Sequence, residues 1–152
     1  MMRLLDYINE ESVFLLEKVD SFDAMIEVAA HVLAPKIECA TDAVIKAVQQ
    51  RELASSTAIG FGCAIPHAVF QSAAKTIAGI ILLKNPLKIA TPDGIDVDIV
   101  FIILGNSQEA RIHLKLLSKI ARILHEEETR NKLRVSKTIQ EVMNIIGASD
   151  AD

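Results

Sequence analysis

The segment Ser55–His67 reads SSTAIGFGCAIPH and contains the histidine with the most distinctive surroundings in the chain. Gly60 and Gly62 allow the backbone a tight turn or a close approach to a ligand. Pro66 fixes one backbone dihedral directly before His67 and favours extended geometry at the residue ahead of it. A neutral imidazole can act near pH 7 as a nucleophile, a base or a metal ligand. The local sequence leaves these roles open, together with a purely structural histidine in a glycine-rich turn.

Other groups near His67 can support phosphoryl transfer, which needs an in-line nucleophile and donors for the equatorial oxygens. Imidazole has an ordinary pKa of about 6.5, so much of it is neutral in a cell. Arg51 ends a predicted helix ahead of the glycines, where its guanidinium either complements the helix dipole or holds a phosphoryl group. Further donors are the hydroxyls of Ser56 and Thr57 and the backbone N–H groups of the loop 60–64, which includes Gly62 and Cys63. An apolar collar would limit water and offer a docking surface for another protein; its members are Ile59, Phe61, Ile65, Val69 and Phe70.

A second histidine, His113, falls on the apolar stripe of a predicted helix, in register with Leu117, Ile120 and Leu124. A histidine in such a stripe is often a core residue. However, the segments that follow buried strands are where open α/β sheets commonly build sites. His31 and His125 lie away from the apolar faces of their helices, so we expect them to be exposed.

Other chemistries have weaker support. A metal site would have Cys63, His67 and His113 as ligands at most, without a Cys-x-x-Cys or His-Glu-x-x-His pattern. A hydrolase using Cys63 lacks an orienting acid. No Walker sequence or kinase glycine loop is present, so we expect no nucleotide, metal or other cofactor and a phosphoryl donor brought by a partner protein. A regulatory binding module is also open, because a phosphoryl group adds charge that can switch an interface.

The sequence from Arg51 to His67, RELASSTAIGFGCAIPH, resembles the signature of the type 2 IIA domains of the bacterial phosphoenolpyruvate-dependent phosphotransferase system. That signature is approximately R-E-x-x-x-S-T-x-I-G-x-G-x-A-I-P-H, and every fixed position is present. The resemblance extends over about residues 3–147. It is strong again from Pro86 through the Pro-Asp-Gly turn to Leu104, and at HLKLL from His113 to Leu117.

The resemblance implies a phosphocarrier, hence a phosphotransferase. His67 would accept a phosphoryl group from phospho-HPr on its ring nitrogen remote from the main chain. It would pass the group to a IIB protein for uptake of a fructose- or mannitol-class sugar, with a membrane IIC component involved only indirectly. His113 and Arg51 would lie close to the acceptor. The alternative is a nitrogen-regulatory IIA protein. The segment 34–38 replaces the family's usual glycine-containing turn, so the subtype stays open.

The whole chain, residues 1–152, predicts one α/β domain with a core at about 3–147. Two unbroken apolar segments, 75–83 and 98–104, predict strands buried on both faces, with a hairpin around Thr91–Gly94. We expect a mixed, mostly buried sheet of about five strands flanked by helices on both sides. The first 19 residues predict a short helix or turn and then a short strand. Pro35 is expected to end the first helix and Gly147 the last, with a frayed tail beyond it; the predicted helices are 20–33, 41–53, 109–125, 129–135 and 137–146.

The composition sets broad limits. The chain has 152 residues, 51% of them hydrophobic, and a net charge of −4. No basic cluster appears, which argues against nucleic acid or an anionic membrane as a partner. Two cysteines fit a reducing compartment, and no secretory signal or membrane-spanning run is apparent. We therefore expect a cytoplasmic protein.

Overall fold

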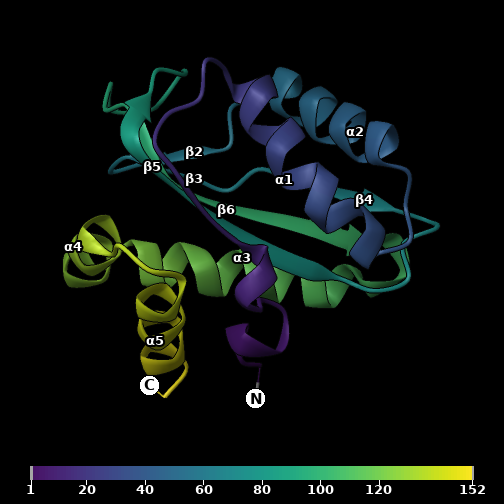
Figure 1. Cartoon of the computed structure of the whole chain (residues 1–152). Helices are drawn as coiled ribbons and strands as arrows, with labels where there is room; N and C mark the ends of the chain where they lie inside the picture. Colours follow the sequence, from purple (N-terminus) through teal and green to yellow (C-terminus); the bar gives the residue numbers. More distant parts are fainter. Residues whose placement is uncertain (1, 152) are drawn as a thin grey trace.

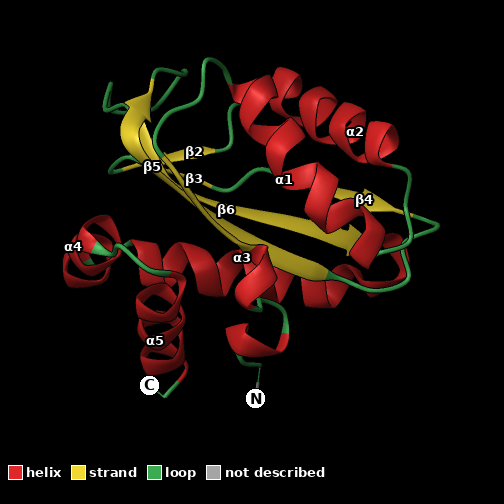
Figure 2. Cartoon of the chain, in the orientation of Figure 1, coloured by secondary structure: helices red, strands yellow, loops and turns green. Residues whose placement is uncertain are grey.

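A six-stranded sheet lies between two groups of helices in the computed structural model, which describes residues 2–151 (Figure 1). Helices α1 (Phe22–Lys36) and α2 (Thr41–Ala54) cover one face of the sheet. The other face is covered by α3 (Ala110–Leu124), α4 (Glu127–Val135) and α5 (Ile139–Asp150), and by the short 3-10 helix η1 (Leu4–Asp6). Figure 2 shows the two groups of helices and the sheet between them, coloured by secondary structure. The predicted α/β fold with helices on both sides is confirmed.

The sheet is mixed and has the order β1-β5-β6-β3-β2, with β4 also paired to β6. The two long apolar segments form the antiparallel pair β5 (Ile77–Leu87) and β6 (Val97–Asn106), as predicted. Strand β1 (Val13–Leu16) runs parallel to β5, whereas β2 (Ala58–Gly60) is antiparallel to β3. Strands β3 (Cys63–Ala64) and β4 (His67–Phe70) both run parallel to β6 and are separated by Pro66, which has no backbone N–H.

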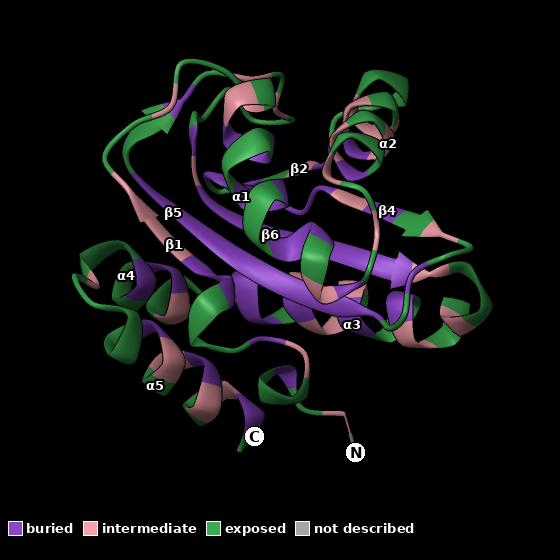
Figure 3. Cartoon of the chain, turned by 45° about the vertical axis from the view of Figure 1, so that its right-hand side comes forward, coloured by how far each residue is buried: buried purple, intermediate pink, exposed green. Residues whose placement is uncertain are grey.

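Burial on both faces explains the unbroken apolar sequence of β6. Ile99, Phe101 and Ile103 pack toward α3, α4 and α5, and the alternate side chains pack toward α1 and α2. Figure 3 shows that both long strands are buried along most of their length. The chain then turns at β6's end into η3 (Ser107–Glu109) and α3, which positions the first turns of α3 over the sheet.

Two predicted helix ends are wrong. Pro35 lies inside the last turn of α1, where little of the helix follows it. Helix α5 continues through Gly147 to Asp150, so the tail is not frayed there. The Asp150 carboxylate accepts hydrogen bonds from Leu4 N (2.8 Å) and Leu5 N (3.0 Å), and it pairs with Lys119 at 3.0 Å. These contacts with distant segments hold the last turn.

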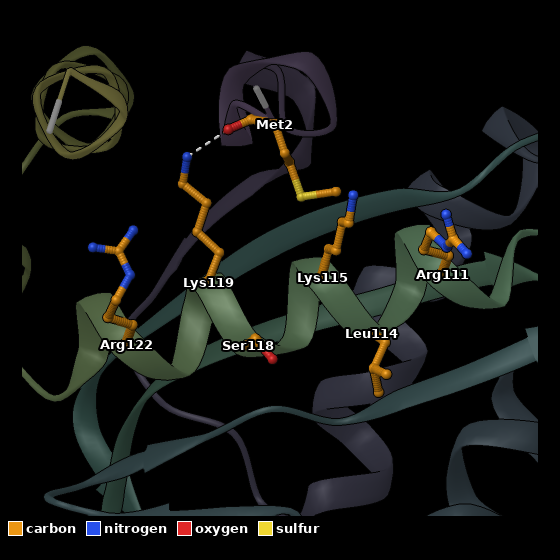
Figure 4. Close-up of a pocket in the computed structure, with 7 residues that line it drawn as sticks. All are labelled: Met2, Arg111, Leu114, Lys115, Ser118, Lys119 and Arg122. Carbon is orange, nitrogen blue, oxygen red and sulfur yellow. Dashed lines mark hydrogen bonds between the residues drawn. The ribbon is translucent and has the colours of Figure 1, made fainter.

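The expectation of no basic cluster is also wrong. Four cations that are scattered in sequence share one face of α3 and line a groove of about 720 Å³ together with Met2 (Figure 4); they are Arg111, Lys115, Lys119 and Arg122. Residues three or four apart are neighbours on a helix, so the cluster forms only on folding.

Among the described residues, 2–151, no helix is both long enough and apolar enough to span a bilayer.

Candidate active site

His67 is the first residue of β4 and is paired with Ile103 of β6. Its ring is half-buried, and Nδ1 lies 2.8 Å from the carbonyl oxygen of Ile65. Because a carbonyl oxygen only accepts hydrogen bonds, this contact requires the ring proton to be on Nδ1. The lone pair is then on Nε2, the ring nitrogen remote from the main chain. The local geometry therefore prepares Nε2 as a nucleophile.

His113, in the first turns of α3, faces His67: the ring centroids lie 5.4 Å apart with an interplanar angle of 65°. The side chain is buried, and its Nδ1 has no hydrogen-bond partner among the described residues. The pKa of His113 is below its ordinary value. Burial is the main cause, and the charge of His67 lowers the pKa further. A neutral imidazole therefore lies beside the ring of His67.

Gly105 makes the position of His113 possible. A Cβ atom on Gly105 would lie 2.7 Å from Nδ1 of His113, well inside normal contact distance. The adjoining turn is held by Asn106, whose backbone N–H donates to Thr76 Oγ1 at 3.1 Å. The Thr76 hydroxyl in turn donates to Glu109 Oε1 at 2.9 Å. These supporting residues were not predicted from the sequence, although an asparagine between a strand and a helix is a recognisable capping signal.

Arg51, Ser56 and Thr57 make other contacts. The Arg51 guanidinium donates to the Ser55 carbonyl oxygen at 2.8 Å, and the Ser56 hydroxyl donates to the Ala90 carbonyl oxygen at 2.7 Å. Thr57 is buried and donates from both its hydroxyl (2.6 Å) and its backbone N–H (3.0 Å) to the Glu52 carboxylate. Among residues 2–151, no hydrogen bond joins any of these three to His67. Helix α2 does pack beside β4, which keeps Arg51 on an element next to the site.

The glycine-rich turn lies away from His67. Cys63 pairs with Ile99, whereas His67 pairs with Ile103, four residues farther along β6. At a rise of about 3.3 Å per residue, this places Cys63 about 13 Å from His67 along the strand. Gly62 lies farther still in the same direction, so the structure does not bring the N–H groups of this turn to the imidazole.

The thiol of Cys63 is buried, and burial is the main cause that raises its pKa to about 11. A protonated thiol is a poor nucleophile and a poor metal ligand. Within the described part of the chain, no group of three or more histidine, cysteine, aspartate or glutamate side chains could hold a metal ion.

The predicted docking residues divide into separate groups. Ile65 is buried, and Phe70 packs against the core under α1 and α2. Ile59 and Phe61 are partly exposed, but at the glycine-rich turn. Beside the two imidazoles, the exposed apolar side chains are Val69 of β4 and Leu114 of α3, which are 51% and 65% exposed. Leu114 was not among the predicted docking residues. His31 and His125 are exposed, as expected.

Comparisons with known proteins identify the family that the chain resembles. The sequence model of the family described as "Phosphoenolpyruvate-dependent sugar phosphotransferase system, EIIA 2" matches residues 6–149. A nitrogen regulatory protein of Bradyrhizobium diazoefficiens is 30% identical over 150 residues, covering 99% of this chain and 98% of that protein. A mannitol-specific phosphotransferase enzyme IIA component of Staphylococcus aureus is 33% identical over 146 residues, covering 94% of this chain and 96% of that protein.

Among solved structures, the nitrogen regulatory protein IIA-Ntr from Neisseria meningitidis superposes with a TM-score of 0.88 at 26% identity, covering 93% of this chain and 97% of that one. The family match spans nearly the whole chain and includes both imidazoles. The resemblance noted at Arg51–His67 is thus confirmed: the chain belongs to the type 2 EIIA family of the phosphoenolpyruvate-dependent sugar phosphotransferase system, whose members act as phosphoryl carriers.

Proposed function

We propose that this chain carries a phosphoryl group on Nε2 of His67, taking it from phospho-HPr and passing it to a IIB protein. The observation that carries the proposal is the 2.8 Å contact between His67 Nδ1 and the Ile65 carbonyl oxygen, which leaves Nε2 as the free lone pair. A nucleophile fixed in one tautomer needs no proton removed before it attacks.

The transfer balances without an added reactant. The Nε2 lone pair attacks phosphorus, a new P–N bond forms, and the P–N bond of the donor phosphohistidine breaks, so its electron pair returns to the donor imidazole. His67 keeps the proton on Nδ1, and the phosphorylated ring is then cationic. The Ile65 carbonyl oxygen faces that proton and stabilises the positive charge. The discharge to IIB repeats these steps in reverse.

His113 is the proposed second participant. Its lowered pKa keeps the ring neutral, so it adds no fixed charge beside His67 and can donate one N–H to a phosphoryl oxygen. Arg51 is the proposed cationic partner, since helix α2 lies against β4 and its guanidinium is bound only to a carbonyl among the described residues. Ser56, Thr57, Gly62 and Cys63 are supporting residues of the fold in this proposal, with no contact to the phosphoryl group. The docking surface around the site consists of Val69 and Leu114.

The destination of the phosphoryl group has two candidates. Uptake of a mannitol- or fructose-class sugar is supported by the similarity to the mannitol-specific IIA component. Regulation of target proteins through the phosphorylation state is supported by the similarity to the two nitrogen regulatory proteins. A discharge assay separates the two. Rapid transfer to a mannitol or fructose IIB protein supports uptake, and a charged carrier that no sugar IIB discharges supports regulation.

The test of the carrier role is the intact mass after incubation with phosphoenolpyruvate, enzyme I and HPr. Wild-type protein should gain one acid-labile phosphoryl group, and His67→Ala should gain none while keeping its fold. The matched control is His125→Ala, which removes an exposed histidine and should be phosphorylated like wild type. His113→Ala and Arg51→Ala should still be phosphorylated but more slowly, by about 10- to 100-fold for loss of a transition-state donor. Phosphorylation of His67→Ala would exclude the proposed acceptor.

A further inference from the structure

The junction between the end of β6 and the start of α3 is held by a buried hydroxyl group, that of Thr76. This residue directly precedes β5, and it is only 5% exposed. Its hydroxyl accepts a hydrogen bond from the Asn106 backbone N–H at 3.1 Å and donates one to Glu109 Oε1 at 2.9 Å. Asn106 is the last residue of β6, and Glu109 directly precedes α3. One hydroxyl therefore links the start of β5, the end of β6 and the start of α3.

This junction carries His113. Glu109 is the N-cap residue of α3, and His113 lies four residues later, at the end of the first turn. A helix turn is stiff, so a displacement of Glu109 relative to the sheet also displaces the His113 side chain. The hydrogen bond between Thr76 and Glu109 is thus the side-chain link from the sheet to the turn that presents this imidazole.

The His113 ring depends on this link because its own contacts do not fix it by hydrogen bonding. Among the described residues, its Nδ1 has no partner. The ring is placed by packing instead, between the backbone of Gly105, which leaves no room for a Cβ, and the ring of His67 at 5.4 Å between centroids. Gly105 directly precedes Asn106, whose N–H binds the Thr76 hydroxyl. The same junction therefore sets both the strand under the ring and the helix that carries it.

We propose that Thr76 and Glu109 are positioning residues for phosphoryl transfer, and that their hydrogen bond sets the place of His113 beside His67. This inference rests on the proposed role of His113 as a donor to a phosphoryl oxygen. A displacement of about 1 Å away from a productive geometry can cost up to about 100-fold in rate, so the link affects the transfer without touching the reacting atoms.

The Glu109 carboxylate acts here as a hydrogen-bond acceptor and not through its charge. The pKa of His113 is lowered by burial and by the charge of His67. A nearby carboxylate that governed the charge of the ring would raise this pKa. A glutamine at position 109, which keeps an acceptor oxygen, should therefore replace the glutamate in this role.

The test compares variants that remove the link with variants that keep it. Thr76→Val removes the hydroxyl at nearly constant shape, and Glu109→Ala removes the acceptor; Thr76→Ser and Glu109→Gln keep one partner of each kind. The matched control is Thr138→Val. The Thr138 hydroxyl also donates to a glutamate, Glu141 Oε1 at 3.2 Å, but at the start of α5, which packs on η1, β1 and α4.

Two measurements are made on each variant, in the wild-type and the His113→Ala backgrounds. The first is the single-turnover rate of transfer from phospho-HPr at saturating donor, which reports the step within the complex and not the docking. The second, in chains that retain both histidines, is the nuclear Overhauser effect between the ring protons of His67 and His113, which needs no transfer. Circular dichroism verifies the fold. If Thr76→Val does not fold, Glu109→Ala, at a half-buried position, carries the test.

We expect Thr76→Val and Glu109→Ala to lower the saturating rate about 10-fold and to weaken the Overhauser effect. Thr76→Ser and Glu109→Gln should stay within about threefold of wild type, and Thr138→Val within about twofold. In the His113→Ala background, Thr76→Val and Glu109→Ala should change the rate by less than about twofold, because the ring that they position is absent.

Unchanged rates, or equal losses in the two backgrounds, would overturn the proposal. A loss in Thr138→Val as large as that in Thr76→Val would assign the effect to general destabilisation and also overturn it. Glu109→Gln as slow as Glu109→Ala would show that the charge matters and not the link. A wild-type chain that takes no phosphoryl group would instead refute the proposed function, and the Overhauser effect would still decide whether Thr76 and Glu109 position His113.

Discussion

Gly105→Ala tests whether the strand backbone under His113 positions that imidazole. The new Cβ would lie 2.7 Å from Nδ1 and 3.6 Å from both Cγ and Cε1 of the ring. Contacts of this kind are normally about 3.5 Å or longer, so the overlap with Nδ1 is about 0.8 Å. Gly105 is not among the residues with positive φ, and its backbone therefore accepts alanine. The steric conflict with His113 is thus the main unfavourable effect of the substitution.

The size of the effect follows from the packing. His113 is a buried, rigid ring, so relief of the overlap requires movement of α3 or of the ring itself. Overpacking of this kind costs about 1–3 kcal/mol, and alanine in a strand recovers about 0.5–1 kcal/mol relative to glycine. Gly105→Ala should therefore lower the free energy of unfolding by about 1–2 kcal/mol. In a His113→Ala background the conflict is absent, and the same substitution should be neutral or stabilising.

The assay is a double-mutant cycle of wild type, both single variants and the double variant, by urea unfolding at neutral pH. The expected coupling energy between the two positions is about 2 kcal/mol. The phosphoryl-transfer rate of Gly105→Ala should also fall, because the ring is displaced from His67. Additive unfolding free energies, within about 0.5 kcal/mol, would refute the described packing of His113 on Gly105.

Two further predictions concern stability. Asp150→Ala should lower the free energy of unfolding by about 2–4 kcal/mol, because two buried N–H groups lose a charged acceptor and Lys119 loses its partner. Burial alone would raise the pKa of Asp150, but the N–H groups of Leu4 and Leu5 and the Lys119 ammonium lower it. The gap between variant and wild type in denaturant unfolding should therefore be full above about pH 4 and shrink as pH falls through the folded-state pKa. Likewise, the pKa of His113 is lower in the folded chain, so the unfolded chain binds more protons below about pH 6.5. Stability should thus fall between pH 7 and pH 5, and a His113→Asn variant should lose less over that range; an equal loss would exclude His113 as a cause.

The sequence predicts the elements well and their long-range contacts poorly. Strand and helix periodicity identified β5, β6 and α3, since burial on one or two faces leaves a direct pattern in the sequence. The proximity of His113 to His67 was implied by the resemblance, and the contact between the two rings agrees with it. In contrast, the contact of Asp150 with Leu4 spans nearly the whole chain, and no local pattern indicates it. The cations that share one face of α3 have helical spacing, but they are never adjacent in the sequence and therefore do not stand out there as a cluster.

The placement of the glycine-rich turn has a different cause. Gly62 and His67 are five residues apart, a short distance in sequence. However, Pro66 disfavours a helical turn at Ile65, and extended residues advance about 3.3 Å each. The donors of the turn therefore could not reach the imidazole. Proximity in the sequence does not give proximity in space here, because the residues between Gly62 and His67 are extended.

This separation gives the glycines a role at a distance from the chemistry. Gly60, Phe61 and Gly62 all have positive φ, and a Cβ on Gly62 would lie 2.6 Å from the Arg134 guanidinium and 2.9 Å from Asp98. The Gly62 carbonyl oxygen accepts hydrogen bonds from the N–H groups of Asp98 (3.0 Å) and Ile99 (3.1 Å) at the start of β6.

The turn thus anchors β3 to one end of β6, and the extended connection through Pro66 then fixes which residue of β6 lies beside His67. Because side chains alternate between the two faces of a sheet, a slip of one residue would turn His67 away from α3. The register therefore explains the glycines and the proline ahead of His67: they hold its ring on the face of the sheet where His113 lies.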